Sequence, residues 1–326
     1  MSAPLDLAPF SRPLLARSLW QLLSTAVPLG ALWWVMAETA PRVPWAVTWL
    51  GAVPAGLLLF RLFMIQHDCG HGSFFRSRLA NDVAGTLIGV TSNIPYHYWR
   101  RTHALHHANS SRLEGRDELG SLVTLTVREY RALPRWKKAL YRAYRHPLGM
   151  VGVGAVLQLQ LKHRFPWDTP RRWRREWAGI FATNLAFPAL LGLLALRWGW
   201  GTVLEVEVPI LLVTGWFGVW MIYMQHVFPG GWFARDGEWS LQEASLRGSS
   251  YYRLPRVLRW LTADVGLHHV HHLGQQVPNY RLQEAMDANP ELAAVKPISL
   301  WESRRCWDCQ LWDEDAGRFV KVPAGP

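Results

Sequence analysis

The chain has 326 residues, of which 50% are hydrophobic and only 18% are charged. Lys and Arg outnumber Asp and Glu by 35 to 24, and these charges lie mainly between long apolar stretches, which excludes both intrinsic disorder and an ordinary soluble enzyme. Basic residues beside apolar stretches fit an anionic lipid surface better than a nucleic acid, so we expect a membrane lipid partner and no nucleic-acid partner.

Four apolar stretches approach the roughly 20 residues that cross a bilayer as a helix. In chain order they are residues 19–36, 46–65, 177–196 and 203–224. Each contains a proline, which membrane helices tolerate. We therefore predict a single all-α membrane domain over residues 1–326, with four transmembrane helices in two hairpins. A cleavable signal peptide at 19–36 is the alternative, but the stretch is long for one and no A-x-A site follows it.

Two further apolar stretches, 83–95 and 148–161, would cover only about 20 Å as helices at 1.5 Å per residue. Neither should span a bilayer, and we expect both to be re-entrant or interfacial. The distribution of Lys and Arg gives the orientation. Each connection within a hairpin holds one basic residue, whereas 100–175 holds 17 and the chain after 224 holds 11. The positive-inside rule therefore places both termini and the central loop in the cytosol.

Most of the 13 histidines form clusters beside the predicted spans. Residues at i, i+3 and i+4 share one face of a helix, so each cluster should present its imidazoles together. Because two spans separate the clusters, they share one side of the membrane. The clustered histidines are His67 and His71; His103, His106 and His107; His226 at the end of the fourth span; and His268, His271 and His272.

Imidazole binds zinc, copper, nickel and iron, so the ligand type leaves the metal open. Eight or nine ligands are too many for one ion but suit two ions with four or five each. The last cluster reads HHVHH, and spacing alone permits either His269 or His271 to face the metals. The central cluster reads HALHH. Two histidine clusters that serve equivalent metal ions should share one pattern. We therefore assign His271 to the metal-facing position and expect His269 to turn away from the metals.

Other metal sites fit less well. No Glu-x-x-His, as in soluble di-iron bundles, and no HExxH of a zinc protease occurs. Haem would need single histidines deep within facing spans. Cys306 and Cys309 form one isolated CxxC, which lacks the four ligands of a zinc site, so we interpret them as two incidental thiols.

Four segments carry a family resemblance: HDCGHGSFF (67–75), PYHYWRRTHALHHA (95–108), HRFPWDTPRRWRREW (163–177) and GSSYYRLPRVLRWLTADVGLHHVHHLGQQVPNY (248–280). The chain resembles the membrane fatty acid desaturases, most closely the bacterial acyl-lipid Δ12 or omega-6 type. The resemblance implies a cytosolic helical cap with three histidine boxes over an acyl tunnel, in the bacterial inner membrane. It also implies two iron ions (Fe²⁺) held by the box histidines. His226 matches a further family histidine, although VFPGGWF after it departs from the acidic HxFE form.

The implied reaction is O₂-dependent introduction of a cis double bond into a fatty acyl lipid, with ligands and positioning supplied by the protein. The chain has no haem, flavin or iron–sulfur motif, so an external electron donor such as ferredoxin is expected. A fatty acyl or carotenoid hydroxylase or ketolase on the same scaffold is the alternative. A non-enzymatic metal-binding membrane protein is less favoured, because a metal store needs no apolar tunnel.

The remaining polar residues are assigned smaller roles. Asp264 stands where the family often has Asn, and could hold a water or orient an imidazole. Three other carboxylates accept imidazole N–H groups or cap helices, namely Asp68, Asp82 and Asp117. His97, His146 and His163 lie outside the boxes and are expected at the interface. Arg100, Arg101 and the RRWRR run at 171–175 are interpreted as headgroup contacts, with docking of an acidic carrier as the alternative.

Overall fold

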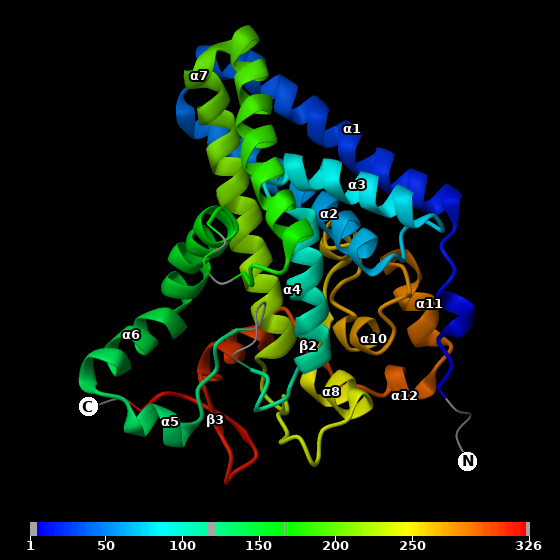
Figure 1. Ribbon diagram of the computed structural model, residues 1–326, viewed down its shortest axis with the longest axis vertical. Coiled ribbons are helices and arrows are strands. Elements are labelled where there is room, and N and C mark those ends of the chain that lie inside the picture. Colours follow the sequence, from blue (N-terminus) through cyan, green and yellow to red (C-terminus); the bar gives the residue numbers. More distant parts are fainter. Residues whose placement is uncertain (1–4, 117–121, 166, 168, 324–326) are drawn as a thin grey trace.

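The structure is a computed structural model that describes residues 5–116, 122–165, 167 and 169–323. Long helices form the upper part of the molecule in Figure 1, and short helices and strands form a cap below them. The helices are α1 (Leu15–Thr39), α2 (Trp45–His71), α3 (Arg78–Thr91), α4 (Tyr96–Asn109), α5 (Val127–Ala132), α6 (Arg135–Arg145), α7 (Arg174–His226), α8 (Leu241–Gly248), α9 (Arg256–Leu261), α10 (His268–Leu273), α11 (Leu282–Asp287) and α12 (Pro290–Ala293).

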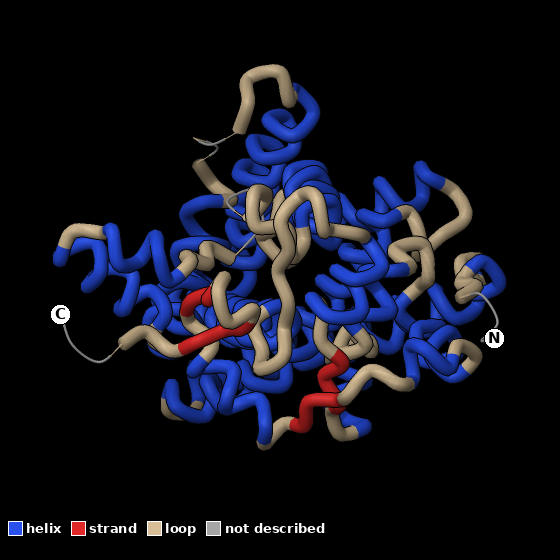
Figure 2. Tube along the Cα trace, turned by 90° about the horizontal axis from the view of Figure 1, so that it is seen from below, coloured by secondary structure: helices blue, strands red, loops and turns tan. Residues whose placement is uncertain are grey.

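Short helical turns and strands complete the described chain. The 3₁₀ turns are η1 (Ala8–Phe10), η2 (Ala40–Arg42), η5 (Asn279–Arg281) and η6 (Glu302–Asp308), and the π-helical segments are η3 (Leu148–Gly154) and η4 (Leu157–Lys162). Strand β1 (Tyr251–Arg253) pairs in parallel with β2 (Pro297–Ser299), and β3 (Leu311–Asp313) pairs antiparallel with β4 (Arg318–Val320). Figure 2, in which the molecule is seen from below, shows the two strand pairs (red) apart from each other. The all-α prediction is confirmed for most of the chain and missed these strands, which are too short to show a period-2 pattern.

Within the described part of the chain, three helices are long and apolar enough to cross a membrane by length and composition: residues Leu15–Arg42, Trp45–His71 and Arg174–His226. The first two contain the predicted spans 19–36 and 46–65. The third has 53 residues and contains both 177–196 and 203–224. A straight helix of that length would extend about 80 Å at 1.5 Å per residue.

Helix α7 folds back on itself at Gly199. The backbone there has φ 76° and ψ 154°, outside the helical region. Both ends of α7 contact the 14-residue α4, since Gly179 lies against His97 and His226 lies against His106. A short helix can meet both ends only if α7 reverses direction, as Figure 1 shows. The two predicted helices on either side of Gly199 are therefore antiparallel neighbours.

Helix α2 connects the apolar bundle to the cap. It packs closely on the second half of α7, because a Cβ at Gly56 would lie 2.7 Å from the Val213 side chain. It then continues past its apolar stretch to Gly72, whose left-handed backbone (φ 72°) ends the helix. His67 and His71 therefore occupy the last turns of a rigid helix and share one face.

Neither of the two short apolar stretches forms a helix long enough to cross a bilayer. Residues 83–95 fall largely in α3, which exposes Leu79, Val83 and Leu87 at helical spacing. Residues 148–161 fall in η3 and η4, which expose Leu148 and Val153. Both segments thus present apolar side chains outward at the base of the long helices.

Candidate metal centre

The nine predicted histidines come together in two groups, in each of which one ligand atom per residue lies within 4.8 Å of the others. The five-histidine group contains His67, His71, His103, His107 and His271. The four-histidine group contains His106, His226, His268 and His272. They are supplied by the ends of α2 and α7 together with α4 and α10.

Each HxxHH box is divided between the two groups. On α4, His103 and His107 join the five-histidine group, while His106 joins the other. On α10 the division is reversed, so that His271 joins the five-histidine group while His268 and His272 join the other. Residues at i and i+4 point in nearly the same direction on a helix, and i+3 lies to one side. The repeated pattern therefore lets two facing helices contribute to both groups.

The imidazole rings face one another through their Nε2 atoms. In the five-histidine group the Nε2 atoms of His67 and His103, and of His103 and His107, are 3.0 Å apart. In the four-histidine group His226 Nε2 lies 3.0 Å from that of His106 and 2.9 Å from that of His268. A neutral imidazole has one N–H, so converging nitrogens cannot all be satisfied by one another.

Burial favours the uncharged form of the six clustered imidazoles on α4 and α10. Desolvation, followed by the neighbouring imidazoles, lowers the pKa of His103, His107, His268, His271 and His272 well below the usual range. Desolvation lowers the pKa of His106 to about 4. The neutral form is the one that binds metal. Two sets of four and five imidazoles fit two metal ions, with nitrogen donors that suit iron, zinc, copper or nickel.

Two histidine rings are oriented by hydrogen bonds on the side away from their group. His67 Nδ1 lies 3.1 Å from Asp68 Oδ1, and the other oxygen of Asp68 accepts from the backbone N–H and side-chain amide of Asn279, each at 2.7 Å. The His226 ring hydrogen-bonds the backbone of Gly248. Such contacts fix the tautomer and orientation of a ligand. Asn279 had no predicted role, although it lies in the quoted segment VPNY.

His269 is turned away from both groups. Its Nε2 lies 3.2 Å from the carbonyl oxygen of Leu292, and its ring packs against Tyr251 with centroids 5.5 Å apart. The side chain is fully buried. The geometry therefore agrees with the choice of His271 over His269 for the metal-facing position.

Several smaller expectations were wrong. Asp264 pairs with Arg259 at 2.7 Å, and not with an imidazole. Asp82 accepts hydrogen bonds from Arg100 and Arg175, each at 2.9 Å, and therefore anchors two of the arginines that were interpreted as headgroup contacts. His163 is buried beside Tyr98 and is not interfacial. Asp117 lies outside the described residues.

The other predicted surface residues divide between packed and exposed positions. Arg101 lies over the ring of Trp173, 4.8 Å from its centroid, and is 3.9 Å from Glu176. His97, on α4, is half-buried against Gly179 near the start of α7, and His146 is exposed. Cys306 and Cys309 are free and buried.

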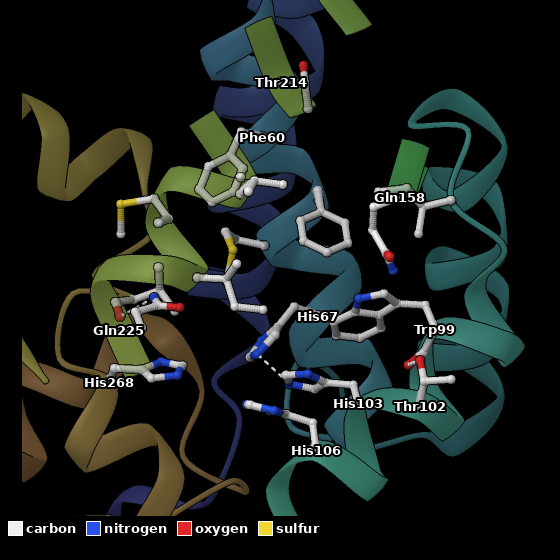
Figure 3. Close-up of a pocket in the computed structure, with 18 of the residues that line it drawn as sticks. Phe60, His67, Trp99, Thr102, His103, His106, Gln158, Thr214, Gln225 and His268 are labelled. Atoms are coloured by element: carbon white, nitrogen blue, oxygen red, sulfur yellow. Dashed lines mark hydrogen bonds between the residues drawn. The ribbon is translucent and has the colours of Figure 1, made fainter. Parts of the chain in front are cut away.

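An apolar pocket of about 1020 Å³, counting its open mouth, ends at the histidine groups. In Figure 3, Phe60 and Thr214 lie at one end, while His67, His103, His106 and His268 lie at the other. Between them, the walls include Phe63, Met64 and Met221 from α2 and α7. The pocket can therefore hold a long apolar molecule with one part beside the imidazoles.

Comparison with known proteins identifies the family. The family model for fatty acid desaturases matches residues 44–304. The chain belongs to the fatty acid desaturase family. A "Fatty acid desaturase" of Bacillus subtilis is 40% identical over 98% of this chain and 90% of its own. An "sn-1 oleoyl-lipid 12-desaturase" of Synechocystis is 29% identical over 74% of this chain and 68% of its own. An "sn-1 acyl-lipid omega-3 desaturase (ferredoxin)" of Nostoc is 26% identical over 92% of this chain and 84% of its own.

Family membership makes the protein an oxidoreductase of lipid metabolism, and with its apolar helices indicates a membrane protein. The matched residues extend from the start of α2 into η6, and so include all nine clustered histidines. The resemblance inferred from the four sequence segments is thus confirmed at the level of the family.

Proposed function

We propose that the protein is an O₂-dependent di-iron desaturase that introduces a cis double bond into the acyl chain of a membrane lipid. The observation that supports this most directly is that the apolar pocket ends at the two histidine groups. The names of the Synechocystis and Nostoc relatives both support an acyl-lipid substrate. The name of the Synechocystis relative supports the Δ12 or omega-6 position, and that of the Nostoc omega-3 desaturase supports a ferredoxin-type donor.

The nine clustered histidines would hold two irons, five at one and four at the other. When bound, iron supplies the redox chemistry with O₂ that removes hydrogen from unactivated methylenes, which no side-chain acid or base can do. The chain's own residues position the reactants. Phe60, Phe63 and Met64 line an apolar wall that orients the acyl chain and excludes water. Asp68 holds the proton of His67 on Nδ1, which leaves Nε2 free to bind metal.

The proposal includes the placement of the protein in the membrane. The four helical stretches at 19–36, 46–65, 177–196 and 203–224 would cross the bacterial inner membrane as two hairpins. Both termini and the histidine groups would then lie on the cytosolic side, where Lys and Arg are concentrated. This placement opens the pocket toward the lipid and leaves the cap accessible to a soluble electron donor.

The test is expression in a host that makes saturated and monounsaturated lipid chains but no dienes, followed by mapping of every double bond. We expect a diene whose new cis bond lies at the Δ12 or omega-6 position, and no diene from His106→Ala. A new double bond placed only in saturated chains would reject the Δ12 assignment while keeping desaturation. A hydroxylated or keto product would instead favour oxygen insertion on the same scaffold.

Elemental analysis tests the metal independently of product formation. Protein purified without chelators should contain about two irons per chain, because two separate imidazole groups are present. Active protein with stoichiometric zinc and no iron would contradict the proposal.

A further inference from the structure

A second, smaller cavity adjoins the histidine centre. Its volume is about 440 Å³, counting its mouth, against about 1020 Å³ for the apolar pocket. His106, Ile222 and His226 line both, so they form a shared wall. The four-histidine group therefore lies between two spaces of different size.

Polar side chains from the end of α4 and the segment that follows it line one part of the smaller cavity, beside apolar side chains such as Val227 and Phe233. Five of its lining residues carry a hydroxyl, amide or guanidinium group, namely Asn109, Ser110, Ser111, Arg116 and Thr124. Ser110 is 5% exposed and Thr124 is 1% exposed, so these groups belong to the interior. Buried polar groups require hydrogen-bond partners.

Three polar atoms of the lining residues have no partner among the described residues: His106 Nδ1, Ser110 Oγ and Arg116 Nε. The other nitrogens of Arg116 donate to the Leu113 carbonyl and the Glu129 carboxylate. Glu129 balances the guanidinium charge, so the free Nε–H suits a neutral acceptor better than an anion. A water molecule needs two to four polar partners and about 30 Å³. The cavity provides both.

The proposed reaction requires a polar route to the metals. A saturated chain, O₂, two electrons and two protons give the alkene and two waters, so each turnover must bring in protons and release water. An acyl chain in the larger pocket would block that path. The smaller cavity reaches His106 and His226 without crossing the larger pocket.

We propose that the smaller cavity holds ordered water that delivers protons to the four-histidine group and carries product water away. This inference rests on the proposed desaturase function. Water there accepts from His106 Nδ1–H and from Arg116 Nε–H, while Ser110 Oγ donates or accepts. With Nε2 of His106 directed at the metal, this water takes the orienting role that Asp68 has for His67. Ser110 is thus a positioning residue for the water chain.

The occupancy of the cavity can be tested by X-ray hydroxyl-radical footprinting of the iron-loaded protein in nanodiscs, without substrate or donor. Val227 lines the cavity and is 1% exposed, so bulk solvent does not reach it. Leu282 is equally buried in a separate apolar cluster. Trapped water predicts oxidation of Val227 several-fold above that of Leu282. Equal, background oxidation of both residues would show a dry cavity and overturn the proposal.

Ser110→Val supplies the matching variant. Ser110 has an extended backbone (φ −57°, ψ 132°) that a β-branched residue adopts easily, and Val both fills space and removes the hydroxyl. It should lower Val227 oxidation several-fold. Thr102→Val, on helix α4 just before Ser110 but facing the larger pocket, should leave Val227 oxidation unchanged. Ser110→Ala removes the hydroxyl without adding bulk, so it gives a second, milder comparison if the Val variant does not fold.

Turnover gives an independent readout. With donor and substrate present, Ser110→Val should release several-fold more of the consumed O₂ as hydrogen peroxide and change the solvent deuterium isotope effect, with an unaltered KM for the lipid. An unchanged peroxide yield and isotope effect would overturn the proton role. Failure of the desaturase function itself would appear differently, as absence of alkene in the wild type with the footprinting result intact.

Discussion

His269 and His271 lie two residues apart on α10 and have different surroundings. His271 Nε2 is 3.1 Å from His107 Nε2 inside the five-histidine group, whereas His269 contacts the Leu292 carbonyl. His271→Ala should therefore lose iron and activity. His269→Ala should keep iron and at least partial activity, with a stability loss of about 1–3 kcal/mol because a fully buried side chain and its hydrogen bond to Leu292 are removed. Paired iron and product assays decide between them, and the opposite ranking would overturn the assignment.

Asp68 and Asp82 allow a matched test of ligand orientation. Asp68 holds His67 and Asn279, while Asp82 accepts from Arg100, Arg175 and Tyr96. Asp68→Asn should weaken metal affinity about 10–100-fold, since the amide cannot hold the His67 ring as a carboxylate does. Asp82→Asn should leave affinity within about two-fold, because no imidazole contacts it. Competition with a calibrated chelator measures both, and equal losses would mean that Asp68 acts only through folding.

At the scale of elements, we expect substitution by Ala to have opposite effects on stability at Gly199 and at Gly201 in α7. A Cβ at either position meets nothing within 4 Å, so packing does not distinguish them. Gly199 has φ 76° and ψ 154°, a conformation nearly restricted to glycine, and Gly199→Ala should cost about 1–3 kcal/mol. Gly201 has no positive φ, and Gly201→Ala should be neutral or stabilise by up to about 1 kcal/mol. Thermal unfolding in detergent should show the difference.

The helices that position the metal centre were predictable because apolar length and i, i+4 spacing are local properties. His103 and His107 necessarily share a face of α4, wherever that helix lies. The separation of His106 into another group was not predictable, since it depends on where α7 and α10 meet α4. The same limit explains why the expectations for Asp264 and His163 were wrong. Their partners, Arg259 and the pocket wall, are set by how the chain folds around them.

At the scale of the whole molecule, the histidine centre is one of the places where the long helices meet the cap. Helices α2 and α7 enter it from the bundle, and α4 and α10 enter it from the cap side. Iron bound there would connect elements that are far apart in sequence. Because the unfolded chain lacks the preformed site, metal binding should add to the stability of the folded state.

Removal of iron should make the stability of the protein strongly dependent on pH. Burial lowers the pKa of His106 to about 4, and lowers those of His103, His107, His268, His271 and His272, whereas an unfolded chain has histidine pKa values near 6.5. At a pH between the folded and the unfolded pKa values, the unfolded chain binds protons that the folded protein does not. The free energy of unfolding therefore falls as pH decreases below about 6.5, by up to about 1.4 kcal/mol per pH unit for each such histidine.

The measurement is thermal unfolding of iron-free and iron-loaded protein at pH 7.5 and 5.5. The iron-free protein should lose most of its stability at the lower pH. The iron-loaded protein should lose less, because protons must displace the metal before the imidazoles can charge. Equal stability of the iron-free protein at both values would mean that the histidine groups take up protons in the folded state, and would contradict a centre built from buried, neutral imidazoles.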